Sequence, residues 1–341
     1  MASIPRLFKN QAITSMVKQM RLGRDFTNLL YFDYLSDAEK RKLESGDLTV
    51  ADADAMAQLA AKADIPGQVA AAKSLGLDHV ELDGAVPNPY LNFKDEQKDR
   101  AREAASAKGI SLSFHLPYSY VGAAVCSPEN YDREASVGLH KRYLGFASEI
   151  GCRYAIIHPG FIPFYHATGR YLEQARAALV KSLIKLGEFS SSNGIDLHLE
   201  NNTAFDRIFF EPAEICDIVE EVGKSGVKIY FCFDIGHWLT RADIGMSIPK
   251  PPERIIEEIP EGVSKEFHLN DYIPQKRIFH PPLDEGVGLL KRKNLERYAE
   301  LVSGKGVELI VVETAIRNRE QVMRRKEVLK GETEYIQAIF R

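Results

Sequence analysis

Residues 194–200, GIDLHLE, join a glycine to a short β-rich run that ends in a carboxylate. The same phrase recurs along the chain, each time with a glycine just before the apolar run. The other copies are GLDHVEL (76–82), GISLSFH (109–115), GCRYAIIH (151–158), GVKIYFCFD (226–234) and GVELIVVE (306–313). A phrase repeated at this spacing indicates one βα unit used many times.

The runs themselves have the length and composition of strands that are buried on both faces. Longer segments of helical period separate them, and a glycine follows most of these segments, as expected at a helix end. The expected strands are 79–83, 110–115, 153–158, 195–200, 228–234, 264–269 and 307–313. The expected helices are 94–108, 135–150, 171–192, 212–222 and 289–303.

These are seven strands, whereas a closed (β/α)₈ barrel needs eight. The segment TNLLYFD (27–33) is the expected first strand. The sequence therefore predicts an α/β protein, a single (β/α)₈ TIM barrel over 27–341. A helical extension is expected over 1–26, and a partly helical insertion over about 34–65, after the first strand. A doubly wound open sheet is the alternative, but no G-x-G-x-x-G follows the first strand.

Composition limits the classes of function. The 341 residues carry a net charge of −4, with 45% apolar and 27% charged residues, which is ordinary for a soluble globular chain. No apolar run reaches the length of a membrane span. The mild acidity does not favour a general nucleic-acid surface. The four cysteines have no C-x-x-C spacing, so reduced thiols in the cytoplasm are expected.

The ends of the expected strands carry most of the chemistry. In a barrel of this class the active site lies at the carboxyl ends of the strands. Those ends hold Glu81-Leu82-Asp83, His115, His158, Glu200, Asp234 with His237 close behind, His268 and Glu313, and His280 follows in the loop 279–288.

The alternation of side chains along a strand predicts that these groups face the barrel axis. Leu197 and Leu199 must face the helices, so Glu200 faces the barrel axis, and Asp234 does so by the same rule. Imidazoles and carboxylates on a rigid rim are typical of a divalent-metal site, with Zn²⁺ or Mn²⁺ expected and Co²⁺ or Mg²⁺ as alternatives. Clustered carboxylates would otherwise repel one another in a half-enclosed mouth.

Other residues have weaker assignments. His198 is expected one layer deeper as a core histidine, and Glu266 as half of a buried ion pair. The side chains expected at the surface are His79, His140 and His166. The rim side chains expected to contact substrate are Tyr118 and Trp238, as an apolar wall for a sugar ring, and Arg277, for a phosphate or carboxylate.

Seven phrases resemble the xylose isomerase-like barrel superfamily. They are HLPY (115–118), HPG (158–160), LENN (199–202), FDIGH (233–237), FHLND (267–271), HPPLDEGVG (280–288) and VVET (311–314). The resemblance covers about residues 27–315. That superfamily contains sugar and sugar-phosphate isomerases and epimerases, and also abasic-site nucleases of the endonuclease IV type.

The isomerase and epimerase branch implies one divalent ion held by Glu200, Asp234, His268 and Glu313. In ketose epimerases the two glutamates also act as acid and base on opposite faces of the substrate carbon, and the residue matching His237 contacts substrate. The resemblance thus implies an enzyme that moves a proton at a carbon next to a carbonyl. A related dehydratase or lyase would use the same chemistry.

The nuclease branch resembles the chain further at His115 and His158, which would bind a second metal bridged by Glu200. His237 and His280 match its third site, but Ile278 stands where that branch has an aspartate. A carbohydrate substrate is therefore expected, with nuclease action on abasic DNA as the alternative and a second metal left open. A barrel with a purely structural metal is a third hypothesis. The oligomeric state, including a homo-oligomer, stays open.

Overall fold

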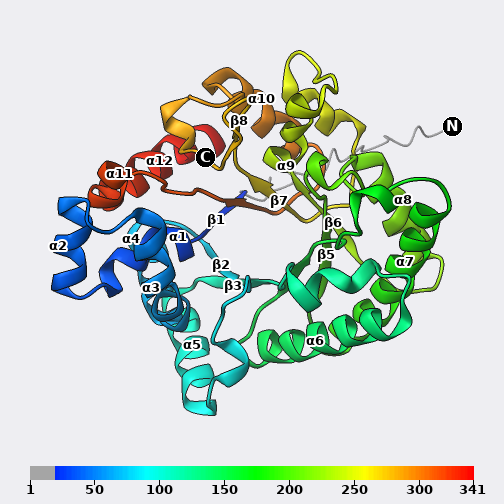
Figure 1. The fold of residues 1–341 in the computed structure, drawn as a ribbon, viewed down its shortest axis with the longest axis horizontal. Coiled ribbons are helices and arrows are strands. Elements are labelled where there is room, and N and C mark those ends of the chain that lie inside the picture. The colour runs from blue at the N-terminus through cyan, green and yellow to red at the C-terminus, as the bar shows by residue number, and fades with distance from the viewer. Residues whose placement is uncertain (1–19) are drawn as a thin grey trace, which may run out of the picture.

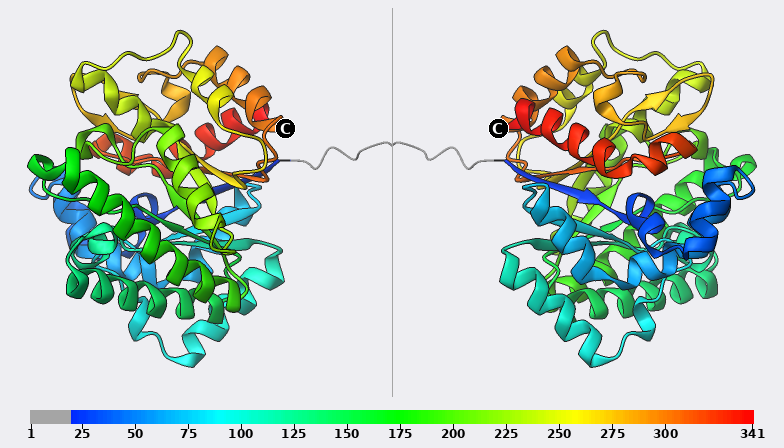
Figure 2. Two further views of the ribbon diagram at one scale, coloured as in Figure 1. Left: turned by 90° about the vertical axis from the view of Figure 1, so that its right-hand side faces the viewer. Right: turned by 90° about the vertical axis from the view of Figure 1, so that its left-hand side faces the viewer.

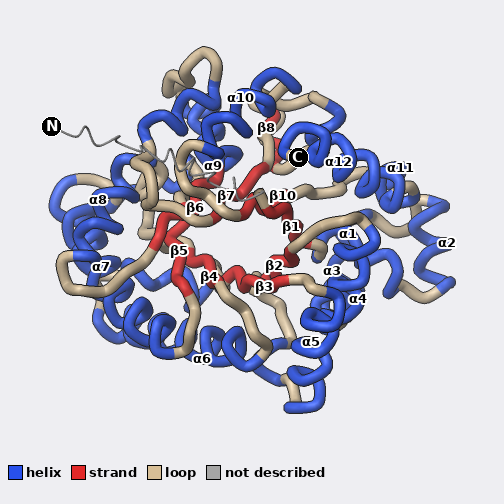
Figure 3. The backbone as a smooth tube through the Cα atoms, turned by 180° about the vertical axis from the view of Figure 1, so that it is seen from behind, coloured by secondary structure: helices blue, strands red, loops and turns tan. Residues whose placement is uncertain are grey.

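The computed structural model describes residues 20–341 and forms a closed barrel of eight parallel strands surrounded by helices (Figures 1 and 3). Around the ring the order is β1-β10-β7-β6-β5-β4-β3-β2, so neighbours in the chain are neighbours in the barrel. The strands are β1 (Arg21–Asp25), β2 (His79–Asp83), β3 (Ser111–His115), β4 (Tyr154–Ile157), β5 (Asp196–Glu200), β6 (Tyr230–Asp234), β7 (Glu266–Leu269) and β10 (Leu309–Val312). The predicted (β/α)₈ TIM barrel is confirmed.

The helices lie outside this ring, and the loop after β7 adds a small antiparallel hairpin. The helices are α1 (Thr27–Leu30), α2 (Asp37–Ser45), α3 (Val50–Ala63), α4 (Ile65–Ser74), α5 (Asp95–Lys108), α6 (Asn130–Glu149), α7 (Gly169–Ser192), α8 (Pro212–Gly223), α9 (Ile235–Leu239), α10 (Arg292–Ser303), α11 (Arg319–Met323) and α12 (Arg325–Phe340). The hairpin pairs β8 (Tyr272–Ile273) with β9 (Ile278–Phe279). No helix within residues 20–341 is long and apolar enough to span a membrane.

The first strand is not where the sequence predicted it. Residues 27–34 form α1 and a 3₁₀ turn, and the strand is β1, whose sequence RLGRD contains two arginines and an aspartate. β1 pairs in parallel with both β10 and β2 and so closes the ring. The prediction of a strand at 27–33 is therefore wrong, and the last residues of the predicted extension belong to the barrel. Residues 1–19 of that extension lie outside the described residues.

The insertion after the first strand has the helical character that the sequence predicted. Each of its helices begins at a side chain that accepts a hydrogen bond from the first turn: Ser36 for α2, Thr49 for α3 and Asp64 for α4. Ser36 and Thr49 complete their capping boxes with Glu39 and Asp52. α4 packs on β2 and α5, which places it in the outer ring of helices.

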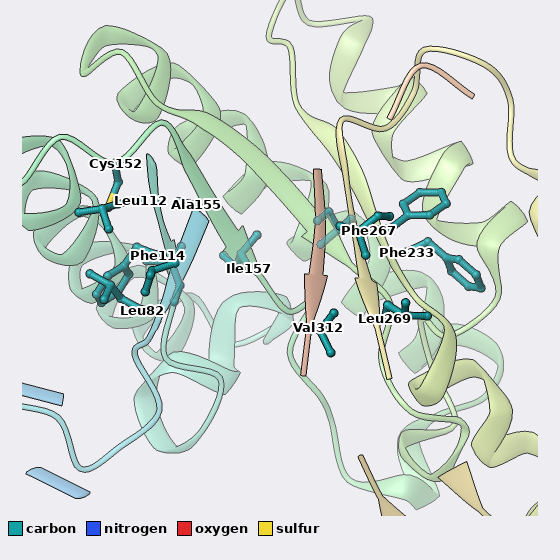
Figure 4. Packing of buried hydrophobic residues seen from close by; sticks show 14 of the residues in the cluster. Leu82, Leu112, Phe114, Cys152, Ala155, Ile157, Phe233, Phe267, Leu269 and Val312 are labelled. Carbon is teal, nitrogen blue, oxygen red and sulfur yellow. The ribbon is translucent and has the colours of Figure 1, made fainter. Parts of the chain in front are cut away.

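Alternation along the strands separates an apolar outer layer from a polar interior. Leu112 and Phe114 of β3, like Leu82 of β2, lie between the strands and the surrounding helices (Figure 4). On the other side of the barrel Phe233 and Phe267 do the same, with ring centroids 5.6 Å apart. The alternate residues of each strand point inward, and there most strands carry imidazoles, carboxylates or hydroxyls, whereas Leu309 and Val311 of β10 form a small apolar cluster with Tyr154.

Two buried histidines overturn predictions of exposure, one inside the barrel and one on a surrounding helix. His79 is fully buried inside the barrel, between the hydroxyls of Ser111 and Ser113, and is not a surface residue. His140 is buried in α6, with Nδ1 3.3 Å from the carbonyl oxygen of Ser136, and is not at the surface either. His166 is partly buried.

Two other interior predictions are confirmed. His198 and Glu266 are both fully buried, 3.1 Å apart, as a core pair. All four cysteines are unpaired.

Candidate functional site

Glu200 is the centre of a cluster at the carboxyl ends of the strands. Its carboxylate is fully buried and contacts four imidazoles. Oε2 lies 3.0 Å from Nε2 of His115 and 3.2 Å from Nε2 of His158. Oε1 lies 3.1 Å from Nδ1 of His237 and 3.3 Å from Nδ1 of His268. The inward orientation predicted for Glu200 from strand alternation agrees with this geometry.

His268 of β7 connects this centre to carboxylates at the ends of the two neighbouring strands, β10 and β6. Its Nδ1 lies 3.2 Å from Oε1 of Glu313 and 4.0 Å from Oδ2 of Asp234. Donor atoms of Glu200, Asp234 and His268 all lie within 4.8 Å of one another. The fourth predicted ligand, Glu313, approaches the same imidazole nitrogen. The structure therefore brings together the four residues that the sequence suggested as metal ligands.

Asn270 holds two of these carboxylates and was not predicted. Its Nδ2 donates to Oδ2 of Asp234 over 2.7 Å and to Oε2 of Glu313 over 2.9 Å. Asn201 supports the same corner, because its Oδ1 accepts the backbone N–H of Asp234. Both amides come directly after a strand that carries a site residue at or next to its end, in LENN and FHLND, and that position was the signal available in the sequence.

Three further groups of donors overlap with the first. His115, His158 and Glu200 form one, Asp234, His237 and His280 form another, and Glu81, His115, His268 and Glu313 form the third. Asp234 is the N-cap of α9, and its Oδ1 accepts a hydrogen bond from the backbone N–H of His237 over 2.6 Å. This bond holds His237 close to Asp234. The histidines predicted as second-metal or substrate groups therefore lie at the site.

A cavity of about 290 Å³ opens beside these groups. Tyr118, which the sequence suggested as a substrate contact, lines this cavity, and its ring centroid lies 5.0 Å from that of His158. The other lining residues are His115, His158, Gly160, Phe161, Asn202, Thr203, Asp206, His237, His280 and Glu313. A larger hollow of about 630 Å³ lies between α4 and α12, but none of the candidate metal-binding groups among the described residues is there.

Two predicted substrate contacts are not in this cavity. Trp238 is fully buried, with its indole Nε1 3.3 Å from Oε2 of Glu211 and the guanidinium of Arg241 over its ring. The prediction that Trp238 walls a sugar ring is therefore wrong. Arg277 is largely exposed and lies over the ring of Phe205, 5.1 Å from its centroid, so the structure does not bring it to the cavity.

The two glutamates have opposite electrostatic surroundings. Burial alone would raise the pKa of Glu200, but the imidazoles of His158 and His268 hold it well below its ordinary value. Burial raises the pKa of Glu313 well above its ordinary value, and the nearby charges of Asp234 and Glu200 add to this against the opposing effect of His268. Carboxyl groups pushed apart in this way can serve as a base and an acid at one pH.

The histidines around Glu200 respond to it in turn. Burial would lower the pKa of His115, but its hydrogen bond and charge interaction with Glu200 raise it to about 9. The pKa of His237 is raised to about 10 by Asp234 and Glu200, again against burial. His79, deeper in the barrel, has its pKa lowered to about 3 by burial, so it is neutral.

The donor set fits a divalent cation. Oε1 of Glu200, Nδ1 of His268 and Nε2 of His280 are buried and make no hydrogen bond within the described residues. Buried polar atoms without partners are rare in folded proteins and call for an ion or water. A mixed set of carboxylate oxygens and imidazole nitrogens is one that Zn²⁺ and Mn²⁺ accept.

The model of the family described as xylose isomerase-like TIM barrel matches residues 69–338, which covers the barrel from α4 to α12. The chain belongs to the xylose isomerase-like TIM barrel family. The resemblance seen in the sequence is confirmed. No curated protein sequence matches the chain.

Several solved structures share this fold at low sequence identity. A putative xylose isomerase from Rhodospirillum rubrum ATCC 11170 has 12% identity and a TM-score of 0.70, covering 94% of this chain and 99% of that one. D-psicose 3-epimerase with D-tagatose from Clostridium cellulolyticum H10 has 13% identity, a TM-score of 0.64 and the same coverages. A 3-keto-D-glucoside 4-epimerase from E. coli has 14% identity and a TM-score of 0.57, covering 81% and 94%. At these identities the likeness establishes the fold.

Proposed function

We propose that the protein is a divalent-metal-dependent sugar or sugar-phosphate isomerase or epimerase. The observation that carries this proposal is the convergence of Glu200, Asp234 and Glu313 on Nδ1 of His268, next to a cavity that reaches Glu313. Three carboxylates around one imidazole nitrogen provide hard, anionic donors for one cation. The cavity beside them provides room for a small polar molecule.

Glu200, Asp234, His268 and Glu313 would hold the ion. When bound, a divalent cation acts as a Lewis acid that polarises a carbonyl oxygen and makes the neighbouring C–H more acidic. The remaining steps belong to side chains of this chain. They must remove a proton from that carbon and return one, which requires a base and an acid positioned at the cavity.

Glu313 and Glu200 are suited to these two roles by position. Asn270 fixes one oxygen of Glu313 through its side-chain amide, while Glu313 also lines the cavity. Glu200 is held by imidazoles on both of its oxygens. His237 also lines the cavity, and we assign it to a substrate hydroxyl or carbonyl group.

The named relatives support a carbohydrate substrate by analogy. Among the solved structures of this fold are a D-psicose 3-epimerase in complex with D-tagatose and a 3-keto-D-glucoside 4-epimerase. Both names describe inversion at a sugar carbon. A shared barrel alone does not transfer a reaction, so the site geometry remains the main support.

Metal analysis followed by a turnover assay tests the proposal. The purified protein is stripped with a chelator, reloaded with Mn²⁺, Co²⁺, Zn²⁺ or Mg²⁺ in turn, and incubated with a panel of ketoses, aldoses and their phosphates in D₂O. Exchange of one carbon-bound hydrogen for deuterium in a metal-loaded sample is the expected result. A protein that binds none of these ions, or exchanges no hydrogen on any sugar when loaded, would contradict the proposal.

Phosphodiester hydrolysis is a second candidate, because the donor group of Glu200, Asp234 and His268 shares Glu200 with one further group and Asp234 with another. Hydrolases that use two metals hold them about 3.5–4 Å apart through bridging carboxylates. Nicking of abasic DNA by the loaded protein, together with two or more ions per chain, would favour this reaction over proton transfer on a sugar.

A further inference from the structure

Glu81 lies beneath the proposed metal site and has no role in the function proposed above. It comes from β2, is buried inside the barrel, and approaches His268 from the side of Nε2. Oε1 of Glu81 and Nε2 of His268 lie 3.2 Å apart, within ion-pair distance, and both atoms are buried without a hydrogen bond to any group in the described part of the chain. The two ring nitrogens of His268 therefore face different partners, with Nδ1 toward the proposed ion and Nε2 toward Glu81.

The other oxygen of Glu81 is fixed by hydroxyl and imidazole groups deeper in the barrel. Ser113 Oγ donates to Oε2 of Glu81 over 2.8 Å. A hydroxyl has one proton, so Ser113 must accept from Nε2–H of His79, which lies 2.8 Å away. Nδ1 of His79 lies 2.8 Å from Oγ of Ser111, whose hydroxyl donates to the carbonyl oxygen of Asp78. The donors of His79 and Ser113 thus both point toward Glu81, as an ionised carboxylate requires.

Packing keeps the chain of hydrogen bonds in place. A Cβ on Gly23 of β1 would lie 2.8 Å from Cδ2 of His79 and 2.9 Å from its Cβ, so only glycine leaves room for that ring. His79 pairs with Gly23 on one side and Ser111 on the other in the barrel register. The glycine in the charged strand β1 thus has a specific use, which is to admit an imidazole into the core.

We propose that Glu81 is a positioning residue that selects the Nε2–H tautomer of His268 and so leaves Nδ1 free to bind a metal ion. This inference rests on the proposed metal-dependent function. A neutral imidazole has one proton, and the carboxylates of Glu200 and Glu313 near Nδ1 would otherwise attract it. A carboxylate on the far nitrogen reverses that preference, as the partners of metal-bound histidines generally do.

Metal affinity is the measurement that separates this role from a structural one. Glu81→Gln keeps the size of the side chain but removes its charge, and Ser113→Ala removes the hydroxyl that orients it. Glu266→Gln is the matched control, because Glu266 is an equally buried carboxylate that faces His198 and not His268. Binding of Co²⁺ and Mn²⁺ is measured by competition with a chromophoric chelator, and melting of the stripped proteins reports on folding.

We expect Glu81→Gln to weaken ion binding about 10- to 100-fold. Ser113→Ala should weaken it less, and Glu266→Gln should stay within about threefold of the original chain. Equal affinity in a folded Glu81→Gln variant and the original chain would overturn the inference while leaving the proposed function intact. An original chain that takes up no divalent ion would overturn both.

If the variants do not fold, ¹⁵N NMR of the unmutated protein tests the same inference, because it reports which ring nitrogen of each histidine carries a proton and which binds the metal. With histidines labelled by ¹⁵N and one equivalent of Zn²⁺ added, the metal-bound ring should carry its proton on Nε2 and its metal on Nδ1. The same ring should show slow exchange of the Nε2 proton, because Glu81 is buried against it. A metal on Nε2, or a proton on Nδ1 of the bound ring, would overturn the inference.

Discussion

Glu200 and Glu313 are the same kind of side chain in two different environments. Glu200 has imidazoles around both oxygens, whereas Glu313 has other carboxylates near it and a single close imidazole. Burial therefore has opposite net results, with the pKa of Glu200 lowered and that of Glu313 raised. Neither outcome follows from the residue type or from the strand on which it lies.

Replacing Glu313 tests its proposed acid–base role. Glu313→Gln keeps the hydrogen bond from Asn270 but cannot exchange a proton with substrate. We expect turnover on the true substrate to fall by about 10²–10⁴-fold, with weaker metal binding as well. The measurement is kcat at saturating metal, with the exposed Glu300→Gln on α10 as the control. Full turnover in the Glu313 variant would exclude this role.

Substitution of Gly236 tests the role of Asn270, whose side-chain amide donates to both Asp234 and Glu313. A Cβ at this position would lie 1.5 Å from Oδ1 of Asn270, so alanine must displace that side chain. Asp234 and Glu313 would then lose their shared donor. A displacement of about 1 Å in such a site costs on the order of 10²-fold in rate.

We therefore expect Gly236→Ala to lose at least that much kcat in the metal-saturated protein. Gly138→Ala on α6 is the control, because nothing lies within 4 Å of its added Cβ. In mid-helix this change should stabilise the protein by about 0.5–1 kcal/mol. If the two alanine variants retained equal activity, Asn270 would not be needed at the site.

Individual site residues could be predicted where strand alternation and position agree. Glu200, Asp234, His268 and Glu313 lie within one residue of the carboxyl end of a strand, and their neighbours of opposite parity are apolar. Glu81 was visible in HVELD, and the outward Leu82 gives its direction, but its use depends on Ser113 and His79 on the same level of the barrel. Trp238 could not be placed, because a tryptophan after a site histidine can line a cavity or fill the core.

At the scale of elements, β1 and α12 depend on each other although they lie at opposite ends of the chain. Arg24 of β1 faces outward and is buried against Glu332 of α12, with Nη1 2.9 Å from Oε2. Thr314, just after β10, donates to the same oxygen. Figure 2 shows α12 running alongside β1 in its right-hand view. The charge of Arg24 can be buried in an outer layer only because Glu332 is there.

Removing Glu332 tests this dependence. Glu332→Ala leaves a buried arginine without a counter-charge, and we expect the free energy of unfolding to fall by about 3–5 kcal/mol. Urea titration measures it, and Glu334→Ala on an exposed part of α12 should change it by about 1 kcal/mol or less. The double change of Arg24→Met with Glu332→Leu should recover much of the loss. A single variant as stable as the original chain would contradict the role assigned to this pair.

This pair also explains why the first strand could not be predicted. Strand prediction relied on apolar runs, and TNLLYFD has one whereas RLGRD does not. The charges of β1 are acceptable because of Glu332, which lies 308 positions away from Arg24 in the chain. The other seven strands have apolar outer faces that need no distant partner, and their predicted positions agree with the structure to within a few residues.

α6 provides a pH test at a distance from the proposed metal site. Burial lowers the pKa of His140 to about 4, whereas the unfolded chain binds the proton near pH 6.5. Protonation therefore favours the unfolded state, and stability is lost as the pH falls from about 6.5 toward 4. Between pH 8 and pH 5 the loss from this residue is about 2 kcal/mol.

His140→Gln removes the titrating group and should remove that part of the pH dependence. The measurement is urea unfolding of both proteins at pH 8 and pH 5, and the quantity compared is the difference between the two pH values. His166→Gln, at a partly buried position in the loop after β4, is the control and should leave the difference unchanged. An identical pH dependence in the original chain and His140→Gln would show that His140 is not buried in its neutral form.

At the scale of the whole molecule, the proposed metal site joins parts of the chain that are far apart in sequence. Glu200, Asp234, His268 and Glu313 lie at the carboxyl ends of β5, β6, β7 and β10, which are consecutive around one half of the ring. Without a cation, three carboxylates are held close together at the end of that half. A bound ion would reduce the repulsion between these carboxylates. It would bind only the folded protein, because unfolding separates its ligands.

Metal removal should therefore lower the stability of the entire barrel. At a free ion concentration of about 100 times Kd, binding adds about 2.7 kcal/mol to the free energy of unfolding, which amounts to several degrees in Tm for a domain of this size. Thermal melts with excess EDTA and with added Mn²⁺ or Zn²⁺ measure the shift. Asp234→Asn should lose most of the shift, whereas Asp99→Asn on the exposed face of α5 should keep it. A Tm that is the same with and without metal would mean that these strand ends do not share an ion.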